Sequence, residues 1–383
     1  MPPPLRRSGE KYPTPFEKAL AEPLFRSHRR SAPLRRAECG SREAMLQSAA
    51  TNGPLNPARK GAPVNIVVLE GYVNNPGDLS WDALKRYGTV TVYDRTARDE
   101  LAARVADADV AVSSKVAWDA EALSWAPRLK MIALTSTGYN VVDLEAARDA
   151  GVTVSNVPAY STPDVAQMTF ALLLELCLHV GEHSRLVMDG GWTRAKDFSF
   201  WETPLVELAG KTFGIVGMGS IGQAVCRIAR AFGMPVVFEN RSAKPELEGD
   251  GVRQVDLDEL LATADVVSLH VPATPETNRM MNATSLAKMK DGAYLLNTAR
   301  GTLVDEQAVV DALRSGKLAG FGADVVSAEP MRPDNPLLQA KGQNIVVTPH
   351  IAWATHEARG RLLATVAANV GAFVEGKPQN VVD

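Results

Sequence analysis

The sequence has few cysteines and no long apolar run. Its three cysteines, Cys39, Cys177 and Cys226, are scattered over 383 residues with no metal-ligand spacing. This argues against a disulfide scaffold and favours a reducing compartment. The longest apolar run, Phe170–Leu174, ends at Glu175 and is far shorter than the roughly 20 residues of a membrane span. We expect a cytoplasmic protein with no membrane partner and no bound metal.

The charge is nearly balanced overall but not locally. A formal net charge of −3 predicts no nucleic-acid partner. Residues 1–60 differ from the rest, because they are rich in Pro and Arg and carry twelve basic against five acidic residues. They lack a signal-peptide apolar region, and five glutamates argue against a transit peptide. We expect a disordered N-terminal extension over 1–60 or residues upstream of the true start, for which Met45 is a candidate.

The most informative segment is KTFGIVGMGSIG, residues 211–222. Phe213–Val216 is apolar and predicts a strand, and residues 223–232 continue with helical periodicity. The turn between them has the G-x-G-x-x-G pattern of a dinucleotide site, in which phosphates contact the first N–H groups of the new helix. The predicted cofactor-binding residues of this turn are Gly217, Gly219, Ser220, Ile221 and Gly222.

Predicted strands and helices alternate along the rest of the chain, which indicates open parallel sheets covered by helices. The short apolar runs that predict these strands are residues 64–69, 89–93, 110–113, 129–134 and 152–155 before the glycine turn, and 236–238, 266–270, 293–297, 320–324 and 344–347 after it. The segment STPD at 161–164 predicts a helix start with a hydroxyl cap, and the helix runs to about His179. In open α/β sheets, ligands bind outside the carboxyl ends of the strands.

Three residues after the later strands have complementary chemistry. Arg300 has a planar fork of donors that suits a carboxylate. His350 titrates near neutrality and can pass a proton, and Glu329 is an acid that can stabilise the protonated imidazole. These are the catalytic groups needed for hydride transfer to a 2-keto acid. A surface arginine, a turn acid and a loop histidine are the alternative interpretations of the same residues.

These motifs resemble those of the D-isomer-specific 2-hydroxyacid dehydrogenases. The matching segments are GMGSIG, NTARGTLVDEQAVVDAL, GADVVSAEP and TPHIAWAT, and the likeness covers nearly all of residues 64–383. VLEGYVNNPGDLSWDAL and STGYNVVDLEAA are similar to the glycerate dehydrogenase/hydroxypyruvate reductase branch. The resemblance implies reversible reduction of a 2-keto acid, with Arg300 binding the carboxylate, His350 as general acid/base and Glu329 as its partner.

The resemblance also implies the architecture. It predicts an α/β protein with two doubly wound parallel sheets and a discontinuous domain division. Residues 61–157 and 350–383 would form a smaller flavodoxin-like substrate domain, and residues 158–349 a Rossmann cofactor domain. A homodimer is implied too. Trp192 and Trp201 in the connection at 190–204 are consistent with a subunit contact, although a cluster within one subunit would look the same.

Further site residues are carried over from the family. Ser114 stands where this branch often has Asn, next to the substrate residues. The implied substrate residues are Lys115, Thr137 and Gly138. The implied cofactor residues after the strands are His270, Val271, Pro272, Thr277, Thr298, Ala299 and Asp324.

The cofactor prediction depends on the end of the second Rossmann strand, where NAD-using relatives have an acid. Asn240 occupies that position, and Glu239 stands one residue early, on the opposite face of the strand. With Asn240, Arg241, Ser242 and Lys244 available, a 2′-phosphate is favoured, and we predict NADP(H). The alternative is NAD, with Glu239 binding the ribose.

Other functions stay open at this point. Some relatives are dinucleotide-sensing corepressors that bind partners and keep the same three residues. A phosphoglycerate dehydrogenase-type enzyme is another alternative, although an additional regulatory domain would be expected. Formate dehydrogenases lack the acid at the Glu329 position. The sequence does not rank hydroxypyruvate against glyoxylate.

Overall fold

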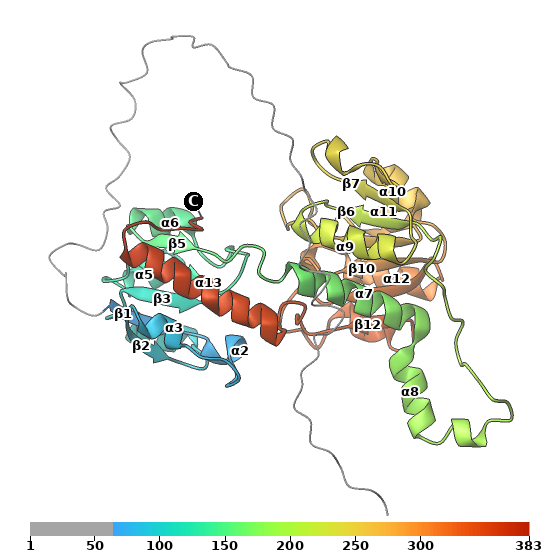
Figure 1. The fold of residues 1–383 in the computed structure, drawn as a ribbon, viewed down its shortest axis with the longest axis horizontal. Coiled ribbons are helices and arrows are strands. Elements are labelled where there is room, and N and C mark those ends of the chain that lie inside the picture. The colour runs from blue at the N-terminus through green and yellow to red at the C-terminus, as the bar shows by residue number, and fades with distance from the viewer. Residues whose placement is uncertain (1–63, 383) are drawn as a thin grey trace, which may run out of the picture. The chain divides into compact units, whose positions relative to one another are not determined.

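The computed structural model describes residues 64–382, so the predicted extension over residues 1–60 lies outside the described residues. Strands and helices alternate along the described part and form two parallel sheets, which confirms the predicted α/β class (Figure 1). The domain limits given above stay a prediction.

The first sheet has five parallel strands in the order β2-β1-β3-β4-β5, the order of a flavodoxin-like doubly wound sheet. Helices cover both of its faces, so the central strands β3 and β4 are nearly continuous apolar runs, whereas the edge strand β2 has no buried residue. Its strands are β1 (Val64–Val68), β2 (Gly88–Val92), β3 (Val110–Ser113), β4 (Met131–Leu134) and β5 (Thr153–Ser155).

The C-terminal helix packs on this first sheet. Leu362 and Val366 of α13 (His356–Val374) are fully buried in one cluster with Ile66 and Val112. The opposite face buries Leu101 of α4 together with strand residues. The remaining helices of this part are α2 (Gly71–Asn74), α3 (Asp82–Lys85), α4 (Arg98–Val105), α5 (Ala120–Ser124) and α6 (Leu144–Asp149).

The second sheet has seven parallel strands in the order β12-β11-β10-β9-β6-β7-β8. The chain runs outward from β6 in both directions, which is the Rossmann arrangement, and the switch point lies between β6 and β9. Its strands are β6 (Phe213–Val216), β7 (Val236–Glu239), β8 (Val252–Gln254), β9 (Val266–Leu269), β10 (Ala293–Asn297), β11 (Leu318–Ala323) and β12 (Ile345–Val347).

Two layers of helices bury the faces of the second sheet. Phe170 of α7 stacks on Phe213 with ring centroids 5.6 Å apart, on the face that α9 also covers. Helices α10, α11 and α12 cover the other face. The helices are α7 (Thr162–Leu178), α8 (Val180–Met188), α9 (Ser220–Ala231), α10 (Leu257–Thr263), α11 (Ala283–Lys288) and α12 (Glu306–Arg314). The 3₁₀ turns are η2 (Trp192–Arg194), η3 (Pro245–Leu247), η4 (Gly301–Leu303) and η5 (Pro336–Ala340).

The sequence-based prediction missed the short helices α2 and α5, and it also missed α8 and β8. Helix α7 ends where expected, at a left-handed His179 with φ of 48°, but α8 begins at once at Val180. No residue of α8 is buried, and it begins directly after the left-handed residue that ends α7, so no loop signal in the sequence separates the two helices. Strand β8 has three residues, none of them buried, at the edge of the sheet, which is too short for an alternating pattern.

The predicted cap of α7 was wrong. The helix begins after Ser161 with Pro163 in its first turn, but the Ser161 hydroxyl makes no capping hydrogen bond. The neighbouring acid has another role, because Asp164 accepts hydrogen bonds from Thr355 and, at 2.8 Å, from Arg361. In the described part of the chain, no single helix is long and apolar enough to cross a membrane; only α7 and α8 together, bent by 57°, meet that length and composition.

Candidate active site

The glycine turn between β6 and α9 is shaped to receive phosphate. Gly217 has a φ of +97°, and a Cβ there would lie 2.6 Å from the carbonyl oxygen of His270. A Cβ at Gly222 would lie 2.2 Å from the Gly217 oxygen, whereas Gly219 has nothing within 4 Å. The first and third glycines therefore allow close packing, and the second leaves open space. No side chain caps α9, so the N–H groups at Ser220 and Ile221 suit a pyrophosphate.

The end of β7 lies against this turn through Asn240. The Asn240 Oδ1 accepts a hydrogen bond from the Met218 N–H at 3.2 Å, and its Nδ2 donates to the Ser242 carbonyl oxygen at 3.0 Å. Glu239 ends the strand half-buried, and burial raises the pKa of its carboxyl group. Within residues 64–382, no hydrogen bond or ion pair holds the Glu239 carboxylate. The Glu239 carbonyl oxygen also accepts from the Gly217 N–H at 2.9 Å, so both residues contact the glycine turn, Glu239 through its backbone and Asn240 through its side chain.

Gln254 of β8 holds the segment that follows Asn240. Its Oε1 accepts from the Lys244 N–H at 2.8 Å, and its Nε2 donates to the carbonyl oxygens of Asn240 and Ser242 at 3.2 and 3.1 Å. The side chain of Arg241 is exposed and makes no ion pair in the described structure. Sequence reasoning missed Gln254 because it missed β8, and no motif marks it.

The segment after β9 contains the next predicted cofactor residues. The His270 Nε2 is hydrogen-bonded to the Ser268 hydroxyl at 2.9 Å. Desolvation lowers the pKa of the His270 imidazole to about 4. The ring is therefore neutral near pH 7. The Thr277 hydroxyl donates to the Pro272 carbonyl oxygen at 2.8 Å. This bond closes the turn over residues 272–277, which Val271 directly precedes.

The turn after β10 presents Arg300. Buried Asn297 braces it, because its Nδ2 donates to the Arg300 carbonyl oxygen at 2.9 Å and its Oδ1 accepts from the Ala299 N–H at 3.1 Å. The Thr298 hydroxyl lies 3.1 Å from that of Thr169 on α7. The Arg300 Nη1 donates to the Ala299 carbonyl oxygen at 2.8 Å, and the rest of the exposed guanidinium stays available.

His350 and Glu329 come together after β12 and β11. The His350 Nδ1 lies 2.7 Å from the Glu329 Oε2. Burial by itself would raise the pKa of Glu329, but the hydrogen bond and charge of His350 outweigh it and hold this pKa below its usual 4.5. Fixing Nδ1 on a carboxylate directs Nε2 outward, as a general acid/base requires.

Asp324, predicted to bind the cofactor, lies beneath the segment that carries His350. It is 1% exposed and accepts hydrogen bonds from the N–H groups of Ile351 and Ala352 at 2.9 and 2.7 Å, as well as from the Thr348 hydroxyl. His350 has a φ of +56°, a conformation that a non-glycine residue adopts only with support. Asp324 gives that support, and its contact with cofactor stays a prediction.

The predicted substrate residues lie on the first sheet. Glu70 accepts from the N–H groups of Ser114 and Lys115 at 2.6 and 2.7 Å, and the charge of Lys115 contributes to the lowered pKa of Glu329. A Cβ on Gly138 would lie 2.8 Å from the Arg300 Nη2. Gly138 therefore lies beside Arg300, and Lys115 lies close enough to Glu329 to affect its pKa.

Thr137, the remaining predicted substrate residue, has its hydroxyl hydrogen-bonded to the protein backbone. The Thr137 hydroxyl donates its proton to the Val157 carbonyl oxygen at 2.8 Å, which leaves only its lone pairs for substrate. Glu70 was not predicted from the sequence. Its only signal in the sequence is its position, as an acid that comes just after an apolar strand. Between residues 64 and 382, no three His, Cys, Asp or Glu side chains are grouped to hold a metal.

A Rossmann sheet with an open glycine turn, and a histidine–carboxylate pair at the ends of neighbouring strands, together define a dinucleotide-dependent oxidoreductase. The family described as "D-isomer specific 2-hydroxyacid dehydrogenase, NAD binding domain" matches residues 170–352. The hydroxypyruvate reductase of Blautia hydrogenotrophica is 47% identical over 323 residues, which cover 84% of this chain and 100% of that protein. The glycerate dehydrogenase of Methylorubrum extorquens is 41% identical over 74% of this chain and 88% of that protein.

A solved structure adds to these relatives. An acyclic imino acid reductase in complex with NADPH and D-Arg aligns with a TM-score of 0.72 at 30% identity, over 84% of this chain and 100% of that chain. The chain belongs to the D-isomer-specific 2-hydroxyacid dehydrogenases, in the branch that includes hydroxypyruvate reductase and glycerate dehydrogenase. It is an enzyme that uses a nicotinamide dinucleotide and interconverts 2-keto acids with D-2-hydroxy acids.

Proposed function

We propose that this enzyme reduces hydroxypyruvate to the corresponding D-2-hydroxy acid with NADPH, and that it acts as a homodimer. The observation that carries the proposed chemistry is the 2.7 Å contact between His350 and Glu329. These residues follow β12 and β11, and β11 also neighbours β10, the strand that precedes Arg300. Glyoxylate, which lacks the hydroxymethyl group, is the second candidate substrate.

The chemistry assigned to each side chain follows from its surroundings. Arg300 binds the substrate carboxylate through its planar fork of donors. The bound nicotinamide supplies a hydride to the carbonyl carbon. His350 gives its Nε2 proton to the carbonyl oxygen as negative charge develops there. The Glu329 carboxylate, ionised because its pKa is lowered, stabilises the imidazolium before the transfer.

The substrate is tested with a panel of 2-keto acids and both reduced cofactors. We expect the highest kcat/KM with hydroxypyruvate, a lower value with glyoxylate and the lowest with pyruvate. His350→Ala should lose about 10²- to 10⁴-fold in kcat, the usual contribution of general acid catalysis, while its affinity for NADPH stays unchanged. Full turnover by purified His350→Ala would contradict the assignment. Cofactor binding without turnover of any keto acid would instead favour the corepressor-like alternative.

The preference for NADPH is supported by the end of β7. Asn240 removes the charge that an acid would place against a 2′-phosphate, and its side chain is held on the glycine turn. Arg241 and Lys244 add positive charge on a segment that Gln254 fixes. A phosphate group carries close to two negative charges near neutral pH. Each charge-assisted hydrogen bond contributes about 1.5–3 kcal/mol.

The cofactor preference is tested by Asn240→Asp combined with Arg241→Ala. An aspartate would repel the 2′-phosphate and accept ribose hydroxyls, so we expect the preference to reverse by tenfold or more, which is about 1.4 kcal/mol. The change should appear mainly in the KM for cofactor, because these groups lie far from the hydride. The measurement is kcat/KM for NADPH and NADH in both proteins. A wild type that prefers NADH tenfold would show that Glu239 binds the ribose.

The proposed homodimer is supported by exposed apolar side chains. They occur on α8 and the loop after it, which extend away from the second sheet in Figure 1. Met188 is 82% exposed, Phe198 90% and Trp201 64%. Grouped exposure of this kind marks an interaction surface.

A further inference from the structure

Glu329, the proposed carboxylate partner of His350, lies on a loop outside the strands and helices. Between the end of β11 at Ala323 and the start of η5 at Pro336, the chain has no regular structure. The position of Glu329 relative to His350 therefore depends on side chains that hold this loop. One buried carboxylate, Glu306, does so.

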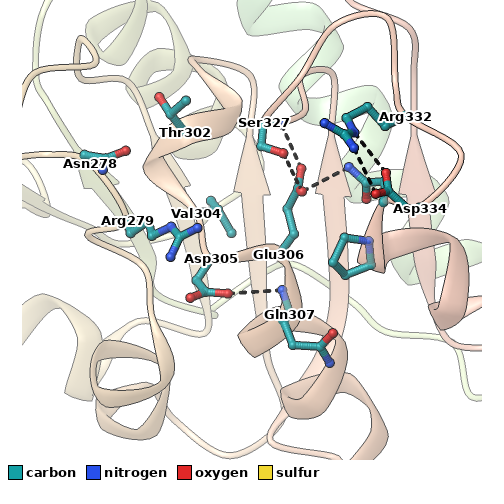
Figure 2. A pocket seen from close by; sticks show the side chains of 12 residues that line it. Asn278, Arg279, Thr302, Val304, Asp305, Glu306, Gln307, Ser327, Arg332 and Asp334 are labelled. Carbon is teal, nitrogen blue, oxygen red and sulfur yellow. Dashed lines mark hydrogen bonds and ion pairs between the residues drawn. The ribbon is translucent and has the colours of Figure 1, made fainter.

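Glu306 is the first residue of α12 and is 8% exposed. Its Oε1 accepts from the Ser327 N–H at 2.8 Å, and its Oε2 accepts from the Ser327 hydroxyl at 2.7 Å and the Asn335 Nδ2 at 3.0 Å. Figure 2 shows these bonds converging on Glu306 from the loop. Among residues 64–382, no Lys or Arg forms an ion pair with it. Three donors and the helix N-terminus instead compensate a buried charge that would otherwise be costly.

The residues that Glu306 holds lie on both sides of Glu329. Ser327 precedes Glu329 by two positions, and Asn335 follows it by six and also caps η5 through the Leu337 N–H at 2.9 Å. Fixing both ends of a short loop restricts the conformations between them. The hollow beside Glu306 in Figure 2, about 550 Å³ in volume, is lined by none of Arg300, Glu329 and His350. The hydrogen bonds that the Glu306 carboxylate makes with other segments therefore go to the loop that carries Glu329.

We propose that Glu306 is a positioning residue, which holds the 327–335 loop so that the Glu329 carboxylate stays on His350 Nδ1. This proposal rests on the proposed function, because it assigns a role within the same acid–base pair. It predicts that loss of Glu306 weakens the interaction between Glu329 and His350. It also predicts that the effect disappears when Glu329 has already lost its charge.

A double-mutant cycle tests the proposal. Glu306→Gln keeps the size of the side chain but places an NH₂ group against the Ser327 or Asn335 donors. We expect the high-pH limb of kcat/KM for hydroxypyruvate reduction to move to lower pH, as it does in Glu329→Gln. Glu306→Gln/Glu329→Gln should match Glu329→Gln within twofold, because coupled residues are not additive. Affinity for NADPH, followed by fluorescence, should be unchanged.

The matched control is Asp305→Asn on the same helix. Asp305 caps α12 through the N–H groups of Gln307 and Ala308, both at 3.2 Å, and makes no contact with the loop in the described structure. Its variant should leave the pH limb in place even if α12 is less stable. An equal shift in Asp305→Asn would overturn the proposal, because helix stability would then explain the effect.

A second variant keeps the test decisive if Glu306→Gln does not fold. Ser327 is exposed, and Ser327→Ala removes one of the three donors with little risk to the core. The limb should move in the same direction by a smaller amount. An unmoved limb in the folded variants, or fully additive losses in the cycle, would refute the role of Glu306. Failure of the proposed function is seen separately, as a wild type that reduces no 2-keto acid.

Discussion

At the scale of single residues, the proposed chemistry depends on the contact between His350 and Glu329. His350 has a left-handed backbone conformation, supported from below by Asp324, and its Nδ1 contacts Glu329 at 2.7 Å. The lowered pKa of Glu329 means that its carboxyl is ionised throughout the range above its usual value of 4.5. Protonation of Glu329 is therefore expected to affect activity only at pH values below about 4.5. The proposed role of His350 needs a proton on its imidazole, so we expect reduction to be lost toward high pH.

Glu329→Gln should move that high-pH limb to lower pH. The variant keeps a hydrogen-bonding group but removes the negative charge that favours the protonated imidazole. We expect a displacement of about one pH unit or more, the usual effect of a close opposite charge. The measurement is the pH profile of kcat/KM with hydroxypyruvate in both proteins. An unshifted limb would mean that Glu329 does not act through its charge.

At the scale of elements, the site depends on how closely the η4 turn approaches the Glu329 loop. A Cβ added to Gly301 would lie 1.9 Å from the carbonyl carbon and 2.0 Å from the carbonyl oxygen of Val326. Backbone, rather than a flexible side chain, occupies that space. The turn that carries Arg300 and the loop that carries Glu329 are therefore in contact only because residue 301 is glycine.

Gly301→Ala should force the turn and the loop apart. A displacement of about 1 Å at a catalytic group can cost about 10²-fold in rate, so we expect kcat/KM to fall by that order. Gly360→Ala is the matched control, because Gly360 lies in α13 with nothing within 4 Å of its added Cβ. Alanine is favoured in a helix interior, so the control should keep its activity and its Tm. A Gly301→Ala protein with kcat/KM within twofold of wild type would show that the contact is dispensable.

At the scale of the whole molecule, the proposed homodimer rests on the apolar surface of α8 and its loop. Specific dimers bury about 800 Å² on each subunit, and exposed Trp and Phe side chains are typical centres of such interfaces. The chain folds this region outside both of its cores. The exposed residues are therefore available to a second copy.

Phe198→Asp combined with Trp201→Asp should convert the dimer to a monomer. Two charges at the centre of an apolar interface are costly to bury, and sedimentation equilibrium gives the mass. Leu338→Asp is the control, since Leu338 is 53% exposed elsewhere on the chain, and it should stay dimeric. If wild type sediments with the mass of one chain, the proposed homodimer is wrong.

Much of this protein is determined by local sequence. Buried parallel strands need continuous apolar runs, and the glycine turn needs glycine at Gly217 and Gly222, so these features were predictable without coordinates. The strands also place Arg300, Glu329 and His350 after β10, β11 and β12. What the sequence could not show was the pairing of these strands and the 2.7 Å contact between His350 and Glu329.

The tertiary structure alone decided which groups support the site. Glu306, Gln254 and Glu70 bond to backbone or side chains that are distant in sequence, and no local pattern marks such partners. Helix α8 follows α7 with no loop between them, and strand β8 has only three residues, so neither gives a separate sequence pattern on which prediction depends. Local preferences and apolar periodicity determined the elements, whereas side-chain hydrogen bonds between separate segments determined the geometry in which the catalytic groups meet.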